Sequence, residues 1–314
     1  MIEGEDLRLF EQSLHRATRT HTGAALDAAL AELGWPDALA ADPHAAVSLV
    51  FGLQGAANVT STALDRVLAH ALGHDAAVVL PALGQCSAPG GWQAGRLSVH
   101  GIGTASLGER TTALIVAHGT GPDVLVEAET ASLTWRPAGG LDPSLGLVEI
   151  TGEVAGAWPV GPADWSAAVT IGQLALGHEL VGASRGMLDL AREHALQRIQ
   201  FGRPIATFQA VRHRLAETLI AVEAAAATLD AAWLDGGPQM AAMAKASAGR
   251  GARVAARHCQ QVLAGIGFTA EHPFHHYLRR VLVLEQLLGA TRCLTRELGQ
   301  EILERGQLPA PLPL

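Results

Sequence analysis

Apolar and polar positions change their spacing twice along the 314-residue chain. From residue 5 to about residue 80, alanines and leucines recur at the helical intervals of three and four residues. The pattern is interrupted at Gly34-Trp35-Pro36 and again at Asp42-Pro43, where glycine and proline indicate chain breaks. This first zone is therefore predicted to consist of short helices.

The second zone, from about residue 81 to residue 160, has a composition typical of β-structure. Four segments rich in Val, Ile, Thr and Leu are separated at short intervals by Gly, Pro and Asp: residues 97–104, 111–119, 123–135 and 146–154. No helical stretch is expected between them, which argues against βαβ units. We expect a small antiparallel sheet or barrel.

The third zone, from residue 161 onward, returns to helical spacing in longer stretches. One apolar stripe at intervals of three and four follows a single helix face: Phe208, Val211, Leu215, Leu219 and Val222. Two further long helices are predicted over residues 239–263 and 276–305. Long helices joined by short connections are typical of a bundle.

These zones predict an α+β fold with three domains: a shortened N-terminal helical domain (1–80), a central small β-domain (81–160) and a C-terminal helical bundle (161–314). A hydrophobic fraction of 49 % is sufficient for several packed units. The formal net charge of -8 argues against a nucleic-acid-binding surface, which needs clustered Lys and Arg.

The cysteines and the apolar runs indicate the compartment. Cys86, Cys259 and Cys293 lie far apart and without metal-ligand spacing, so they are predicted to be reduced thiols. Residues 1–18 carry charge from the third residue and show no signal peptide. No uncharged apolar run approaches the length of a membrane span, so a soluble, cytoplasmic protein is expected.

The segment from Arg198 to Ile205, RIQFGRPI, followed by Phe208-Gln209, resembles the signature of the acyl-CoA dehydrogenase family. The preceding helix, from about residue 178, and the segment 261–280, QVLAGIGFTAEHPFHHYLRR, resemble the same family in the same order. The resemblance implies an acyl-CoA dehydrogenase-like fold whose C-terminal domain is a four-helix bundle, with FAD as the cofactor.

The resemblance also implies which residues contact FAD, in this case the flavin nucleotide of a neighbouring subunit: Arg198, Phe201, Gln209, Gln261, Ala264 and Gly265. Their chemistry suits that ligand. A guanidinium forms paired, charge-assisted hydrogen bonds with a pyrophosphate, and Phe packs against an aromatic ring. A glutamine amide both donates and accepts, and glycine permits close approach of the backbone.

The catalytic carboxylate of the family has no counterpart at its usual positions. These enzymes need a Glu to take the proton beside the thioester carbonyl. In this sequence the usual position, before a Gly, holds Leu288. The alternative position lies near the start of the helix that precedes Phe201-Gly202, and it holds Gly172. The next residue, Gln173, stands in place of the family's Arg. Residues 81–91 lack the acid and the Ser-Asp pair of the family's flavin-binding loop.

Residues that reach a neighbour's FAD are thus kept, while those serving the chain's own site are lost. We predict a short subunit of a heteromeric α₂β₂ acyl-CoA dehydrogenase, similar to those of actinobacterial steroid side-chain degradation. A longer partner subunit supplies the catalytic Glu for α,β-desaturation of an acyl-CoA thioester, and electrons leave to an electron-transfer flavoprotein. The acyl chain, a steroid side chain included, stays open.

Three alternatives stay open beside this hypothesis. Glu271 is a candidate relocated base of a self-sufficient enzyme, and Glu285 is a weaker one. The chain is alternatively a non-catalytic scaffold subunit. A metal site at residues 272–276 with His258 is disfavoured, because Pro273 interrupts the helix face and no Asp or Cys completes the set. The run GIGTASLG, residues 101–108, lacks the spacing of a dinucleotide-binding loop.

Overall fold

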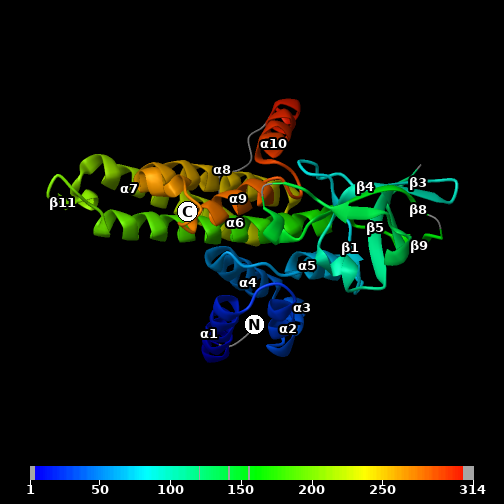
Figure 1. Cartoon of the computed structure of the whole chain (residues 1–314). Coiled ribbons are helices and arrows are strands. Elements are labelled where there is room, and N and C mark those ends of the chain that lie inside the picture. Colours follow the sequence, from blue (N-terminus) through cyan, green and yellow to red (C-terminus); the bar gives the residue numbers. More distant parts are fainter. Residues whose placement is uncertain (1–3, 120, 141, 155, 307–314) are drawn as a thin grey trace.

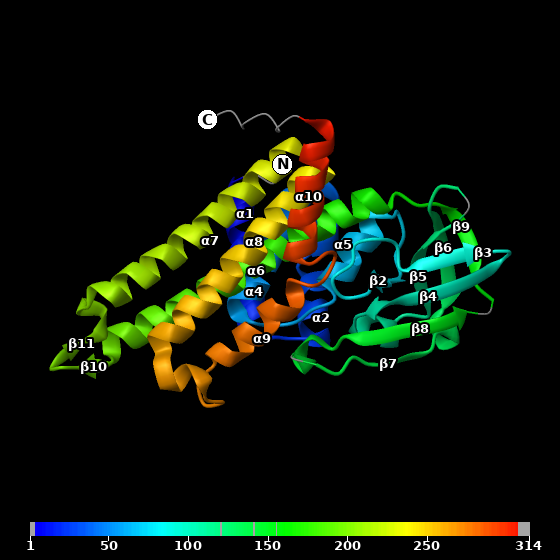
Figure 2. The ribbon, with the colours of Figure 1, turned by 90° about the horizontal axis from the view of Figure 1, so that it is seen from above.

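The computed structural model describes residues 4–119, 121–140, 142–154 and 156–306. Long C-terminal helices run side by side, a sheet lies at one of their ends, and the N-terminal helices cover one side (Figure 1). Seen after a quarter turn, the small hairpin β10–β11 marks the end of the bundle opposite to the sheet (Figure 2). Among the described residues, no helix has the length and apolarity needed to cross a bilayer.

Five helices form the N-terminal part: α1 (Gly4–Thr20), α2 (Ala24–Glu32), α3 (Trp35–Ala41), α4 (Pro43–Ala57) and α5 (Ala63–Ala71). Both predicted breaks are confirmed. Gly34 adopts a left-handed φ of 72° just before α3. The carboxylate of Asp42 accepts a hydrogen bond from the Ala45 amide at 3.1 Å and so caps α4.

The strands are short and follow in close succession: β1 (Ala77–Val78), β2 (Leu80–Pro81), β3 (Gly90–Gln93), β4 (Arg96–Gly103), β5 (Thr112–His118), β6 (Val124–Glu129), β7 (Trp135–Pro137), β8 (Val148–Val154) and β9 (Trp158–Pro162). Each of these strands has eight residues or fewer. Burial alternates along the first half of β4 and is continuous over the middle of β5. Each of the four predicted segments coincides with one strand: β4, β5, β6 and β8. The segment 123–135 ends at the first residue of β7, which follows a 3-10 turn at Thr130–Ser132.

The sheet is mixed, whereas a purely antiparallel one was expected. β4 pairs antiparallel with β8, and β5 with β6, but β1 and β3 both pair parallel with β5. β3 lies between β4 and β5 in the sheet, so the chain crosses to the far side of β3 after β4 and before it forms β5. The pattern of strand residues alone does not encode this crossing. The first strand begins at Ala77, four residues before the expected boundary.

The C-terminal helices are α6 (Trp165–Gln197), α7 (Gln209–Asp235), α8 (Pro238–Leu263), α9 (Phe274–Leu284) and α10 (Thr291–Arg305). The single helix expected over 276–305 is wrong, because the chain turns between α9 and α10. Leu288 and Gly289 take left-handed φ angles of 52° and 102° there. The buried Lys245 amine donates to the carbonyls of Glu285 at 3.0 Å and Gly289 at 2.6 Å, which holds the turn.

The expected apolar stripe on α7 is only partly buried. Val222 is buried, but Leu219 is 49 % exposed, and the buried position one residue earlier is Thr218. At about 100° per residue, a step of four residues overshoots a full turn by about 40°. Two such steps in succession, from Val211 to Leu215 and on to Leu219, take Leu219 off the buried face, and Thr218 lies closer to it.

Helices α4 and α6 approach until their backbones touch. A Cβ on Gly55 would lie 2.1 Å from the carbonyl oxygen of Glu179, and one on Gly182 would lie 2.1 Å from that of Gly52. Such clashes with backbone cannot be relieved by turning a side chain. Glycines on both helices therefore close the space between α4 and α6.

Candidate functional site: a cationic groove at the end of the bundle

The segment after α6 folds into a tight hairpin. β10 (Ile199–Gln200) pairs with β11 (Arg203–Pro204), and Phe201 and Gly202 form the turn with left-handed φ angles of 52° and 74°. Two left-handed residues are what a two-residue hairpin turn requires, but Phe at the first of them is strained. Its side chain gains no burial in return, because it is 91 % exposed. Such strain at an exposed aromatic residue is typical of a binding position.

A groove of about 510 Å³ lies beside the hairpin, lined by Gln200, Phe201, Ile205, Phe208, Ala210, Val211, Arg214, Gln261 and Val262. It joins the hairpin, the start of α7 and the end of α8, which lie at the same end of the bundle (Figure 2). The rings of Phe201 and Phe208 meet edge to face with centroids 6.1 Å apart. The guanidinium of Arg203 lies 4.5 Å from the centroid of Phe208.

The structure brings two of the predicted residues into this groove and leaves others at its margin. Phe201 and Gln261 belong to the lining, although they are far apart in the sequence. Arg198 ends α6 at the base of the hairpin, where its carbonyl accepts from the Ile205 amide at 2.8 Å, and its side chain is exposed outside the lining. Gln209 begins α7 and is likewise exposed outside the lining.

The turn after α8 exposes backbone at the same end of the bundle. Ala264 takes a left-handed φ of 52° at the end of the helix. At Gly265 a Cβ would meet nothing within 4 Å, so its backbone faces open space. Glu271 is exposed in the loop that follows and is not part of the groove lining.

The two positions at which the family base was sought, Leu288 and Gly172, lie against each other in the interior. A Cβ on Gly172 would be 2.5 Å from Cδ1 of Leu288 and 2.9 Å from Cδ2 of Leu68. The amide of Gln173 donates to the Leu288 carbonyl at 2.9 Å. All these side chains are buried, so this place is filled with leucine and has no carboxylate.

The loop of residues 82–88 packs over the same segment. The Gly84 amide donates to the carbonyl of Gln286 at 2.9 Å, and the Ala290 amide donates to that of Gly84 at 3.3 Å. The indole of Trp165 donates to the Cys86 carbonyl at 2.9 Å. These bonds fasten the loop that would serve the chain's own flavin to the turn between α9 and α10.

Glu285, the weaker candidate base, organises that turn. It is 2 % exposed, and its carboxylate accepts from Arg253 Nη2 at 2.5 Å and from the Thr291 amide at 3.2 Å. Burial lowers the pKa of the neighbouring Lys245 to about 7, against the opposing charge of Glu285. A carboxylate bound on both sides in this way is positioned for structure and leaves little freedom to accept a proton.

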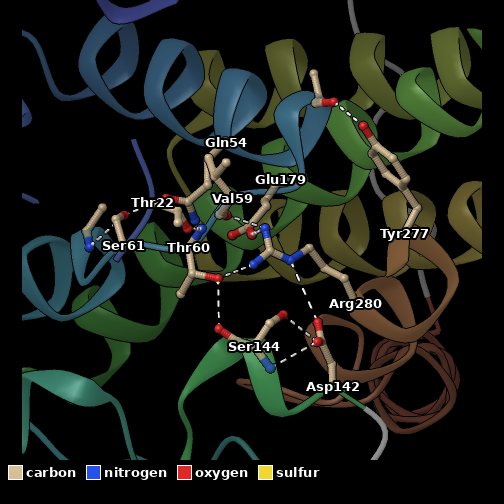
Figure 3. Close-up of polar contacts among 12 residues, drawn as sticks. Thr22, Gln54, Val59, Thr60, Ser61, Asp142, Ser144, Glu179, Tyr277 and Arg280 are labelled. Carbon is tan, nitrogen blue, oxygen red and sulfur yellow. Dashed lines mark hydrogen bonds and ion pairs between the residues drawn. The ribbon is translucent and has the colours of Figure 1, made fainter. Parts of the chain in front are cut away.

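A buried ion cluster that sequence analysis missed joins the three parts of the chain (Figure 3). Arg280 on α9 is 1 % exposed and donates to the Val59 carbonyl and the Thr60 hydroxyl. Its guanidinium also lies 3.6 Å from Glu179 on α6 and 3.9 Å from Asp142 before β8. Burial raises the pKa of Glu179, partly opposed by Arg280. The signal available in the sequence was the paired Arg279-Arg280 on an otherwise apolar helix.

The remaining candidate sites serve local structure. The His272 Nδ1 accepts from the Phe274 amide at 3.2 Å at the start of α9, and the rings of His275 and His276 lie 3.9 Å apart. Within the described ranges, no group of three or more His, Cys, Asp or Glu is arranged to hold a metal ion. In the GIGTASLG run, the hydroxyls of Thr104 and Ser106 donate to the buried Asp65 of α5.

Comparison with known proteins identifies relatives of this arrangement. Residues 165–303 match the family described as acyl-CoA dehydrogenase, C-terminal domain. Acyl-CoA dehydrogenase IpdE2 of Mycobacterium tuberculosis is 35 % identical over 195 residues, which cover 60 % of this chain and 60 % of IpdE2. Acyl-CoA dehydrogenase FadE34 of the same organism is 42 % identical over 123 residues, which cover 37 % of this chain and 17 % of FadE34. The chain thus spans less than two thirds of these relatives.

Two solved structures share the whole fold. A variant of the Tcur3481-Tcur3483 steroid ACAD has a TM-score of 0.81 at 21 % identity, covering 96 % of this chain and 99 % of the other. The ChsE4-ChsE5 complex from Mycobacterium tuberculosis has a TM-score of 0.76 at 22 % identity and 98 % coverage of both chains. These likenesses confirm the predicted fold class.

FAD is the cofactor of acyl-CoA dehydrogenases, and the groove region has the chemistry to bind it. Arg198, Arg203 and Arg214 lie at the hairpin and groove with no acidic residue between them in the sequence, in a chain of net charge -8. Guanidinium groups suit a pyrophosphate, the exposed ring of Phe201 suits a flat ring system, and the amide of Gln261 suits its polar edge. The donor set therefore fits a flavin dinucleotide.

Proposed function

We propose, for this chain whose C-terminal bundle belongs to the acyl-CoA dehydrogenase family, a role as the short, base-lacking subunit of a heteromeric acyl-CoA dehydrogenase. The complex catalyses α,β-desaturation of an acyl-CoA thioester, an oxidation of a CH–CH donor. This chain contributes FAD contacts and an oligomer interface, and a longer partner subunit contributes the catalytic Glu. Electrons pass from the complex to an electron-transfer flavoprotein.

One contrast carries the proposal. The groove at the hairpin is open, cationic and lined by an exposed Phe201, whereas the interior place of the base is filled by Leu288 against Gly172. A chain that served its own substrate would need the second place open and acidic. A chain that completes a neighbour's site needs only the open groove at the hairpin.

Each residue in or beside the groove has a distinct role in this function. When bound, FAD accepts the hydride that leaves the β-carbon while the partner's carboxylate takes the α-proton. Arg198 neutralises charge on the pyrophosphate, and Phe201 covers an apolar ring face and excludes water from it. Gln209 and Gln261 supply amide hydrogen bonds, and Ala264 with Gly265 lets the backbone approach the ligand.

The descriptions of similar structures support a second, finer part of the proposal. The Tcur3481-Tcur3483 protein is described as a steroid ACAD, and it and the ChsE4-ChsE5 complex are each named after two components. We therefore propose a steroid side-chain thioester as the substrate class and a longer dehydrogenase subunit as the partner. The three-domain division at residues 80 and 160 is part of the same proposal.

Co-expression with a longer acyl-CoA dehydrogenase subunit tests the proposal. We expect the chain alone to be colourless, and the mixed tetramer to be yellow with half a flavin per chain, by gel filtration and visible spectrum. Arg198→Ala should weaken flavin retention by roughly ten- to hundredfold, since a charge-assisted bond is removed. Arg192→Ala, an exposed arginine one and a half turns earlier on α6, serves as the matched control.

Other outcomes would select the alternatives. A yellow homo-oligomer that reduces its own flavin with acyl-CoA would mean that the chain is self-sufficient. A yellow mixed complex that keeps its full flavin content after Arg198→Ala would indicate a scaffold.

A further inference from the structure

Arg214 is the charged residue in the lining of the groove, although the family signature drew attention to Arg198. It lies on the second turn of α7, and Gln261 from the end of α8 lines the same groove. Its side chain is half exposed, at 51 %. A guanidinium at this place faces whatever anion the groove holds.

A closed ring of hydrogen bonds fixes this guanidinium from behind. Arg214 Nη1 lies 3.2 Å from His258 Nε2, and His258 Nδ1 lies 3.3 Å from the Thr218 hydroxyl. The same hydroxyl donates to the Arg214 carbonyl at 2.8 Å. Thr218 is fully buried and His258 is 4 % exposed, so water does not compete for these bonds.

The donors and acceptors of the ring leave one arrangement. An arginine N–H only donates, so His258 Nε2 must accept, and the imidazole carries its proton on Nδ1. That N–H donates to the Thr218 oxygen, whose own hydrogen goes to the Arg214 carbonyl. Every group in the ring is thereby satisfied, and His258 is neutral.

The charges around His258 agree with a neutral ring. Burial lowers its pKa, and so do Arg214 from α7 and Arg257 from α8, while Glu217 from α7 acts in the opposite direction. Arg257 Nη2 lies 3.5 Å from the same Nε2 that Arg214 approaches. A protonated ring would point an N–H at two guanidinium groups.

Arg214 keeps free donors for the groove. Of the five N–H groups of a guanidinium, one is used on His258 and one meets Glu217 at 3.4 Å, an exposed pair of the kind that contributes little. If Arg214 served only the surface ion pair with Glu217, it would not need the buried, fully hydrogen-bonded imidazole of His258 behind it.

We infer, on the premise of the proposed function, that Arg214 is a further binding residue for the phosphates of the flavin nucleotide and that His258 positions it. Arg214 then binds from within the groove lining, and Arg198 binds from the base of the hairpin, outside that lining. His258 acts through Arg214 alone, because it is buried behind it.

The inference is tested by titration calorimetry of ADP, the nucleotide half of FAD, up to millimolar concentration, with the flavin-free mixed complex. We expect Arg214→Met to weaken ADP binding roughly tenfold or more. His258→Leu should weaken it by a smaller factor, and His258→Gln, which both donates and accepts, should restore it. Arg212→Met removes the same charge from α7 outside the groove lining and should leave binding unchanged.

A spectroscopic readout separates positioning from folding. Nitrogen-15 spectra of the histidines should show the proton of His258 on Nδ1, and Thr218→Val should shift the tautomer while the protein stays folded. ADP binding by Arg214→Met equal to that of the parent chain, with Arg198→Ala still weakened, would overturn this inference and leave the proposed function intact. Absence of ADP and FAD binding by the mixed complex would overturn both.

Discussion

The side chain of Leu288 lies directly over Gly172, where a Cβ would come within 2.5 Å of Leu288 Cδ1. The two positions that the acyl-CoA dehydrogenase resemblance singled out for a carboxylate are therefore neighbours in space, and they close one interior site together. Leu68 completes the contact from α5.

Gly172→Ala should destabilise the fold by about 1–3 kcal/mol, because the added methyl overpacks two leucine ends that must move. Gly299→Ala on α10 is the matched control, since a Cβ there meets nothing within 4 Å. It should leave stability unchanged or raise it by about 1 kcal/mol. Urea unfolding of both variants measures the difference, and equal stability of the two would contradict the packing described here.

Phe201→Gly should separate stability from binding. Glycine adopts the left-handed φ of 52° without strain, so the fold should keep its stability or gain about 1 kcal/mol. Flavin retention in the mixed complex should fall, because the exposed ring is lost. Thermal unfolding and the visible flavin spectrum of the same preparation check both halves; unchanged flavin content would remove Phe201 from the site.

Glu271→Gln should leave turnover of the mixed complex nearly intact, since Glu271 lies outside the groove lining and the proposed function assigns the base to the partner. The measurement is acyl-CoA-dependent reduction of an electron acceptor. Glu285→Gln provides a contrast, because it should cost stability by loosening the bond to Arg253. Collapse of turnover in a folded Glu271→Gln complex would reassign the base to this chain.

Arg280→Met should destabilise the protein by about 3–5 kcal/mol, because it leaves the buried Glu179 and Asp142 without their cation. Arg279→Met, on the exposed side of α9, is the control and should change stability little. Adding Glu179→Gln to Arg280→Met should recover part of the loss. A double variant as unstable as the sum of the single variants would show that the two side chains are not coupled.

His178 should make stability depend on pH. Burial lowers its pKa to about 4 from 6.5, and its Nε2 accepts from the Trp233 indole at 3.0 Å. Between pH 6.5 and pH 4 the unfolded chain binds the proton and the folded chain does not. The contribution of neutral His178 to stability is therefore complete above pH 6.5. Below pH 6.5 the free energy of unfolding falls by up to about 1.4 kcal/mol per pH unit because of this group.

The difference between the parent chain and His178→Gln isolates that contribution from other titrating groups. Glutamine keeps an acceptor for Trp233 but does not titrate in this range. Denaturant unfolding at several pH values should show the parent losing stability relative to His178→Gln as the pH falls. Exposed His74→Gln is the control, and parallel curves for parent and His178→Gln would be evidence against a buried neutral His178.

Features that depend on neighbouring residues were predictable. The zones of helix and strand and the breaks at Gly34 and Asp42 all follow from local backbone preferences. The base-lacking positions were also readable, because the family motifs around Leu288 and Gly172 could be aligned by spacing. The prediction of a single long helix over residues 276–305 was wrong for a physical reason. The turn that interrupts it is held by hydrogen bonds from Lys245 to the carbonyls of Glu285 and Gly289, which lie 40 and 44 residues further along the chain.

By itself, the sequence determined the order of elements, the arginine-rich hairpin segment and the absence of a carboxylate where the family places one, since each is a property of residues close together in the chain. The tertiary structure decided which side chains meet: Leu288 with Gly172, Arg214 with His258, and Arg280 with Glu179. These contacts join helices that pack only when the whole core is formed. Pairing, burial and protonation therefore depend on long-range packing that no local pattern encodes.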